Sequence, residues 1–155
     1  MTDTAEHRTV DPMTTTGLRG TAFAGIVLLL IEFGIGVNLF GTVPKADQGK
    51  GAFAAFGAVF TNGPAALMIH ATVGTLLVVA AVTALVRAVR ARQTPSVVLT
   101  AVALLAVIGA WFSGSSYVGD HASGAARGMA YATALAILCY ALVLLVVRPS
   151  TDREQ

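Results

Sequence analysis

Four apolar stretches dominate the sequence, and each is about 20 residues long. They cover residues 20–40, 64–86, 97–117 and 129–147, and each can cross the roughly 30 Å of hydrocarbon in a bilayer as an α-helix. The composition agrees, because 55% of the residues are hydrophobic and 12% are charged, against about 25% charged in soluble domains. Backbone polar groups inside lipid must be bonded within the chain. The sequence therefore predicts an all-α, four-span transmembrane antiparallel helix bundle.

Polar segments flank the predicted bundle. Residues 1–18 are rich in threonine and charged residues, and we predict that they form a disordered cytoplasmic tail. Residues 19–148 form the predicted transmembrane domain, and residues 149–155 form a second cytoplasmic tail. A signal peptide is the competing interpretation of the first stretch. That stretch exceeds the roughly 7–15 apolar residues of a signal peptide, and no convincing A-x-A cleavage site follows it.

Basic residues lie mainly on one side of the predicted bundle. The side that carries both termini has Arg8, Arg19, Arg87, Arg90, Arg92, Arg148 and Arg153, whereas the other side has Lys45, Lys50 and Arg127. The positive-inside rule therefore predicts a multi-pass protein of the cell membrane with both termini in the cytoplasm.

The longest connection, residues 41–63, contains a second apolar feature. Its sequence AFAAFGAVF places Phe53, Phe56 and Phe60 on one side of a helix that is too short to cross the bilayer. We expect a short interfacial helix or lid on the outer surface. Pro64 follows it, and we expect this proline at the first helical position of the second span.

Two ionisable residues are predicted at a similar depth in the outer half of the bilayer. Glu32 lies eight residues before Phe40, or ~12 Å from the outer helix end, and His70 lies six residues inside Pro64, or ~9 Å from the same side. A charged side chain inside a span costs roughly 2.5–3.5 kcal/mol even on insertion scales. Pairing across helices would lower that cost for both residues. The pair is therefore a candidate functional site, and a structural pair that joins two helices is the alternative.

Other polar side chains are predicted near the same level. Span three ends with Trp111, Ser113, Ser115, Ser116 and Tyr117, and span four has a stripe of Met129, Thr133, Ala136 and Tyr140. His121 and Asp120 fall in the outer loop, and Asn38 is near the end of span one. This asymmetry favours a site that opens outward. Each of these features also has a structural alternative. The aromatic residues could anchor the helix at the membrane–water interface, the Met129 stripe could pack against the neighbouring helices, and the serines could donate hydrogen bonds to nearby backbone carbonyls.

Small residues are expected where the helices meet. Lipid is as apolar as the side chains of the helices, so the hydrophobic effect does not bring helices together in a membrane, and close packing must do so instead. Gly25, Glu32 and Gly36 share one face of the first span, and Gly74 lies one turn beyond His70. Ala130 and Ala134 form a small-xxx-small pair in the fourth span.

The glutamate-bearing helix and the HATVGTLL run that begins at His70 resemble one half of the haem A synthase family. This resemblance implies a four-span bundle that binds haem b, with His70 as the metal ligand and Glu32 orienting the imidazole. The family half has histidines on two helices, but span four here has none. Met129, His121 or His70 of a second copy would then supply the second ligand. The segment GAWFSGSSYVGDHASGAARGMAYATALAILCY is also similar to small actinobacterial membrane proteins, which implies no activity.

Two further functions remain open from the sequence. A non-enzymatic accessory subunit would assemble as a homodimer or within a larger membrane complex, with the Phe53–Phe60 segment as a docking surface. A small proton-coupled transporter or channel would use Glu32, but such proteins are usually built from internal repeats, and none is apparent. The sequence contains no G-x-S-x-G, Walker, Rossmann or zinc motif, and its positive charge marks helix ends rather than a nucleic-acid surface.

Overall fold

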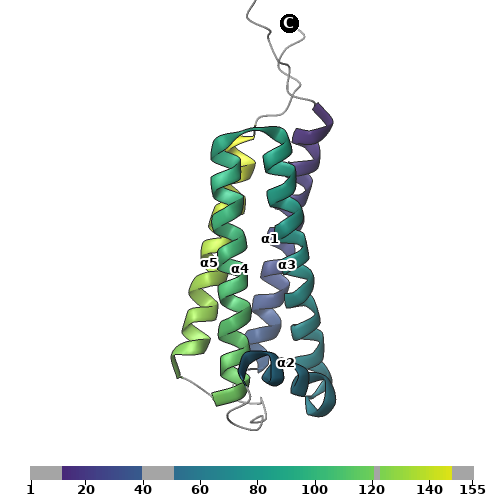
Figure 1. The fold of residues 1–155 in the computed structure, drawn as a ribbon, viewed down its shortest axis with the longest axis vertical. Helices are drawn as coiled ribbons and strands as arrows, with labels where there is room; N and C mark the ends of the chain where they lie inside the picture. The colour runs from purple at the N-terminus through teal and green to yellow at the C-terminus, as the bar shows by residue number, and fades with distance from the viewer. Residues whose placement is uncertain (1–11, 40–50, 121–122, 148–155) are drawn as a thin grey trace, which may run out of the picture.

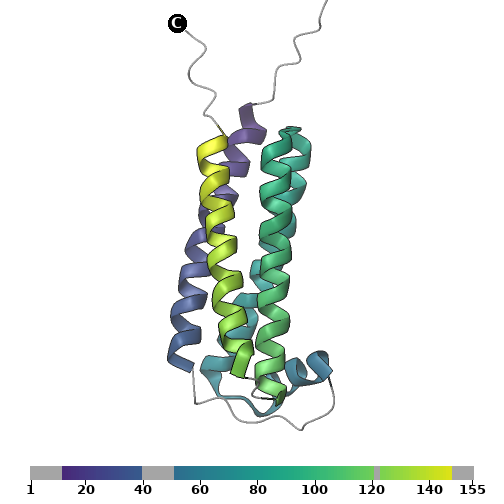
Figure 2. The same cartoon turned by 90° about the vertical axis from the view of Figure 1, so that its left-hand side faces the viewer.

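The computed structural model describes residues 12–39, 51–120 and 123–147, and this part of the chain forms five α-helices. They are α1 (Pro12–Leu39), α2 (Gly51–Asn62), α3 (Ala65–Ala91), α4 (Thr94–Asp120) and α5 (Ser123–Val146). The four long helices run antiparallel to their chain neighbours as a bundle, and α2 lies across one end (Figures 1 and 2). Each long helix is long and apolar enough to cross a membrane. The predicted four-span fold is thereby confirmed.

The helices extend beyond the predicted spans. Helix α1 begins at Pro12, so residues 12–18, which the sequence predicts to be part of a disordered tail, are helical. Proline suits a helix start because its φ angle is already helical. Leu18 is fully buried, and the carbonyl of Gly17 accepts hydrogen bonds from Thr21 and Arg87, so packing keeps this first part helical. The rest of the predicted N-terminal tail, residues 1–11, and the predicted C-terminal tail, residues 149–155, lie outside the described residues.

Small side chains form much of the core. The long helices pack in the order α1, α3, α4, α5, and α5 closes the ring against α1. Fully buried alanines line the helix contacts: Ala22, Ala81, Ala84, Ala88, Ala103 and Ala136. Gly25 lies against the ring of Tyr140, since a Cβ atom there would stand 3.1 Å from Cε2. Ala134 is exposed, so the predicted Ala130–Ala134 packing pair is wrong; the buried stripe of α5 runs through Ala136 and Tyr140 instead.

Arginine side chains hold one end of the bundle together. Arg19 of α1 donates to the carbonyl of Leu144 at 2.8 Å and also to that of Val147, so it satisfies carbonyls at the C-terminus of α5. Arg87 of α3 donates to the carbonyl of Gly17 at 2.7 Å. The start of α1, the end of α5 and the turn between α3 and α4 all lie at this end (Figure 1).

Helix α2 covers the opposite end of the bundle. Ala55 and Val59, one turn apart, are its buried residues, and Phe53 remains exposed. The predicted short helix is therefore present. The Gly63 N–H donates to the carbonyl of Val59, and a Cβ atom at Gly63 would stand 2.4 Å from that oxygen, so this position requires glycine.

Pro64 occupies the N-cap of α3 rather than its first helical position. Its φ and ψ angles are −64° and 151°, which are extended, and its carbonyl accepts from the N–H groups of Leu67 and Met68. Helix α3 therefore begins at Ala65, one residue later than it would with proline at the first helical position. This places His70 on the second turn of α3, facing the inside of the bundle.

Candidate functional site

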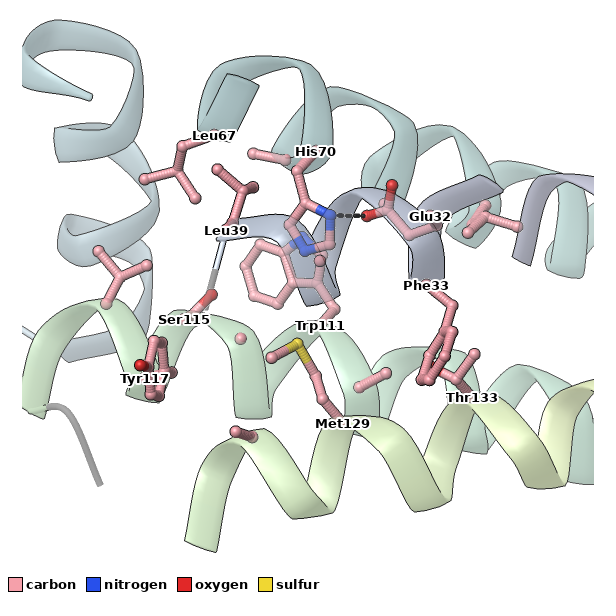
Figure 3. Close-up of a pocket in the computed structure, with 18 of the residues that line it drawn as sticks. Glu32, Phe33, Leu39, Leu67, His70, Trp111, Ser115, Tyr117, Met129 and Thr133 are labelled. Carbon is pink, nitrogen blue, oxygen red and sulfur yellow. Dashed lines mark ion pairs between the residues drawn. The ribbon is translucent and has the colours of Figure 1, made fainter. Parts of the chain in front are cut away.

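Glu32 of α1 and His70 of α3 form an ion pair across two helices. Glu32 Oε1 lies 3.1 Å from His70 Nδ1, and the two side chains are 13% and 19% exposed (Figure 3). Both residues lie in the half of the bundle that α2 covers (Figure 1). The structure therefore brings together the two ionisable residues that the sequence places at a similar depth.

Two glycines make room for this pair. A Cβ atom on Gly36 would stand 3.1 Å from His70 Cε1, and one on Gly74 would stand 3.1 Å from Glu32 Oε1. Gly36 follows Glu32 by four residues on α1, and Gly74 follows His70 by four residues on α3. Residues four apart share a helix face, so each helix presents an ionisable residue and a glycine to the other.

The pair does not satisfy all of its own polar atoms. His70 Nδ1 and Glu32 Oε2 are buried, and neither has a hydrogen-bond partner among the described residues. The 3.1 Å contact is therefore an ion pair whose angles fall outside those of a hydrogen bond. Buried polar atoms without partners cost about 1–3 kcal/mol, and native structures contain few of them. A pair that only joined two helices would be expected to avoid this cost.

A pocket of about 270 Å³ lies beside the pair. All five helices contribute to its lining, which is mainly apolar. Figure 3 shows the second ring nitrogen of His70, Nε2, on the side of the pocket where Trp111 lies. The polar residues of the lining are few: Glu32, His70, Trp111, Ser115, Tyr117 and Thr133.

Met129 reaches this pocket from α5. Its thioether extends toward the region of Trp111 and His70 (Figure 3). Gly114 of α4 makes room for it, because a Cβ atom there would stand 3.2 Å from the Met129 sulfur. Thr133, one turn further along α5, also lines the pocket. Met129 and Thr133 of the predicted stripe therefore face the site, whereas Tyr140 is buried in the core cluster.

The single tryptophan of the chain is held by aromatic rings of α2. The ring centroid of Trp111 lies 5.0 Å from that of Phe56 and 5.7 Å from that of Phe53. Trp111 also meets its neighbour Phe112 in a T-shaped contact at 5.2 Å. Because Trp111 lines the pocket, the short helix α2 supports one wall of the site.

Several polar residues near this level bond to their own helices instead. Ser116 Oγ donates to the Phe112 carbonyl at 3.0 Å, and Asn38 Nδ2 donates to the Gly34 carbonyl at 2.7 Å. For Ser116 this matches the structural alternative. His121 lies outside the described residues. Phe33 and Val37 line the pocket without having been predicted, since an apolar residue within an apolar span carries no distinguishing signal.

The donor set around the pocket is small. Within residues 12–39, 51–120 and 123–147, no group of three or more His, Cys, Asp or Glu side chains is placed to hold a metal ion. His70 is therefore the one imidazole available to a ligand in the described part of the pocket. In comparisons with protein-family models, with curated proteins and with solved structures, no match to this chain was found.

Proposed function

We propose that this integral membrane protein binds a small, flat and mainly apolar molecule in the pocket beside the Glu32–His70 pair. The observation that carries the proposal is the pair itself. It is buried within a bundle of apolar helices, two of its polar atoms have no hydrogen-bond partner among the described residues, and it borders a pocket of about 270 Å³. Ionisable residues inside a membrane are costly and mark functional sites by default.

The size of the pocket limits the ligand. A cavity of ~150 Å³ holds one benzene ring. Pockets for drug-sized ligands measure about 300–1,000 Å³. At about 270 Å³, this pocket suits a ligand of one or two fused rings. A mainly apolar lining with a few polar groups is also the usual composition of a ligand site.

The two ionisable residues would have different roles. Glu32 faces Nδ1 of His70 and would fix the orientation of the imidazole ring. A proton on Nδ1, facing the carboxylate, leaves Nε2 as an acceptor in the neutral ring and as a donor in the charged ring. His70 would therefore hold the polar atom of the ligand, and Trp111 would face its ring.

Haem binding is a second candidate, favoured by the orientation of His70. A carboxylate beside the second nitrogen is the usual setting of a metal-binding histidine, and Met129 would supply a second ligand. The volume of the pocket is too small for haem. A macrocycle of four pyrrole rings is larger than the one- or two-ring ligand that about 270 Å³ accommodates, so we derive no role for the chain through haem.

The test is to identify what the protein carries. The full chain is purified in nanodiscs, its organic extract is analysed by mass spectrometry, and a reduced-minus-oxidised visible spectrum is recorded with and without added haem. The matched variants are His70→Ala and Thr83→Ala, since Thr83 lies on the same helix, is exposed, and bonds to the Val79 carbonyl. We expect a small ring compound in the extracts of the wild type and Thr83→Ala, and its loss from His70→Ala.

Other results would redirect the proposal. Sharp α and Soret bands that disappear in His70→Ala would establish haem as the ligand. Extracts and spectra that are the same for the wild type and His70→Ala would contradict ligand binding at this pair. A protein partner that co-purifies with both variants would then favour the accessory-subunit function.

A further inference from the structure

We infer that the pocket opens sideways into the bilayer between α1 and α5, and that its ligand is a lipid-soluble quinone. The quinone ring would lie beside His70 and Trp111, and its polyprenyl chain would leave between the two helices. This inference rests on the proposed function, because it names the class of molecule that the pocket binds.

The interface between α1 and α5 is tightly packed in one half of the bundle. Arg19 of α1 donates to the Leu144 and Val147 carbonyls of α5, and Gly25 of α1 lies against the Tyr140 ring, with 3.1 Å between the ring and the Cβ position. These contacts hold the two helices together from the arginine-rich end to about the middle of α1.

The interface between α1 and α5 is more open in the half of the bundle that contains the pocket. Phe33 and Val37 of α1 line the pocket although they are 47% and 59% exposed, so they form its rim rather than its floor. On α5, Ala126 and Ala130 line the same pocket with partly exposed side chains. Two alanines leave a gap that larger side chains would fill.

The rim lies at the depth of the acyl chains. Phe33 is six residues from Leu39, the last residue of α1, which corresponds to ~9 Å along the helix. It belongs to the apolar segment Thr15–Leu39, which is long enough to cross a membrane. A molecule that enters between α1 and α5 therefore comes from the lipid, and it needs an apolar body or chain.

The chemistry of the pocket selects among lipid-soluble molecules. A phospholipid head group carries a phosphate, which requires cationic donors, but the charged residue beside His70 is a carboxylate. A sterol has four fused rings and exceeds about 270 Å³. A quinone has one or two flat rings, a carbonyl oxygen that accepts a hydrogen bond from an imidazole N–H, and a ring face that stacks on an indole.

Trp111 provides a direct measurement. It is the one tryptophan in the chain and it lines the pocket, so a bound quinone would quench its fluorescence. The full chain in nanodiscs is titrated with two probes, menadione, which is a naphthoquinone without a chain, and a naphthoquinone that carries a polyprenyl chain. We expect saturable quenching by both probes, and a Kd at least about tenfold higher in His70→Ala, as for the loss of one buried hydrogen bond.

Two leucine substitutions on α5 test the lateral opening. Ala130→Leu fills the rim, and Ala134→Leu, one turn further on, adds the same volume to an exposed position. We expect Ala130→Leu to raise the Kd of the chain-bearing probe about tenfold more than that of menadione. We expect Ala134→Leu to change neither Kd. Circular dichroism confirms that each variant is folded.

The outcomes separate this inference from the proposed function. Quenching by neither probe, or quenching that increases linearly without saturation in the wild type and His70→Ala alike, would overturn the quinone as ligand while the extract experiment still tests for another molecule. Saturable binding of both probes with an equal effect of Ala130→Leu on each would overturn the lateral opening alone.

Discussion

The imidazole of His70 lies against Gly36, with Cε1 3.1 Å from the position of a Cβ atom on that glycine. The reverse contact also exists, since Glu32 Oε1 lies 3.1 Å from the Cβ position of Gly74. Helices α1 and α3 thus exchange the same contact, in which an ionisable residue of one helix occupies the space left by a glycine of the other. The close approach of the two backbones is what allows two short ionisable groups to meet inside the bundle.

A methyl group at Gly36 should disturb this arrangement. We expect Gly36→Ala to destabilise the protein by about 1–3 kcal/mol, the usual cost of overpacking, because the imidazole must move away from the new Cβ atom. The ion pair with Glu32 would lengthen as a result. The measurement is the SDS mole fraction that unfolds the protein in mixed micelles, followed by circular dichroism.

Gly34 provides the matched control for this substitution. It lies on the same helix, and a Cβ atom there would meet nothing within 4 Å. Gly34→Ala should be neutral or should stabilise the helix by about 0.5–1 kcal/mol, because alanine loses less conformational freedom than glycine. Equal effects of the two substitutions would show that Gly36 does not position His70.

Removing one member of the ion pair should cost more than removing both. His70→Leu leaves the Glu32 carboxylate buried without its partner, and breaking a buried pair in this way costs about 3–5 kcal/mol. The double variant Glu32→Leu/His70→Leu replaces both groups with apolar side chains, and such replacements are often neutral or stabilising. We therefore expect the double variant to be more stable than His70→Leu, as measured by unfolding in SDS.

The same pair of variants separates stability from binding. A stable double variant that has lost the ligand would place the function of the pair in binding rather than in folding. If the double variant is no more stable than His70→Leu, then Glu32 does not depend on His70 for its burial, and the ion pair has no energetic role.

The sequence predicts much of this site because depth in a membrane follows directly from position along a helix. At 1.5 Å per residue, Glu32 and His70 fall at similar distances from the same surface, and few other groups can satisfy them there. Gly36 and Gly74 were predicted on the right faces for the same reason, since residues four apart lie on one side of a helix. Periodicity also placed Met129 and Thr133 toward the interior.

The remaining features depend on how the helices are arranged around the bundle, which periodicity does not specify. Phe33 lines the pocket because α1 and α5 are adjacent, and its sequence context resembles that of any lipid-facing phenylalanine. The contact of Phe56 with Trp111 depends on the direction in which α2 crosses the bundle end. Ala134 was misassigned because a spacing of four residues is met on several faces of an alanine-rich helix.

Arg19 should stabilise the last turn of α5. Its guanidinium donates to the carbonyls of Leu144 and Val147, which lack partners within the helix, and hydrogen bonds to charged groups contribute about 1.5–3 kcal/mol. We expect Arg19→Gln to accelerate hydrogen exchange in the last turn of α5, including the Val147 N–H that bonds to Val143. Arg90→Gln is the control, because Arg90 is exposed in the last turn of α3. Equal exchange in Arg19→Gln and the wild type would exclude this role.

The orientation of the bundle in the membrane can be tested with two single-cysteine variants. Four arginines lie toward the end with the α3–α4 turn: Arg19, Arg87, Arg90 and Arg92. The positive-inside rule therefore predicts that this end is in the cytoplasm and that α2 is outside.

Cys139, the one natural cysteine, is buried and is replaced by alanine to remove background labelling. Thr61 of α2 and Thr94 at the α3–α4 turn are both exposed, and each is changed to cysteine in that background. In intact cells a membrane-impermeant maleimide should label Thr61→Cys at once and Thr94→Cys only after permeabilisation. The reverse pattern would place the arginine-rich end outside, and the pocket beside Glu32 would then lie in the cytoplasmic half of the bilayer.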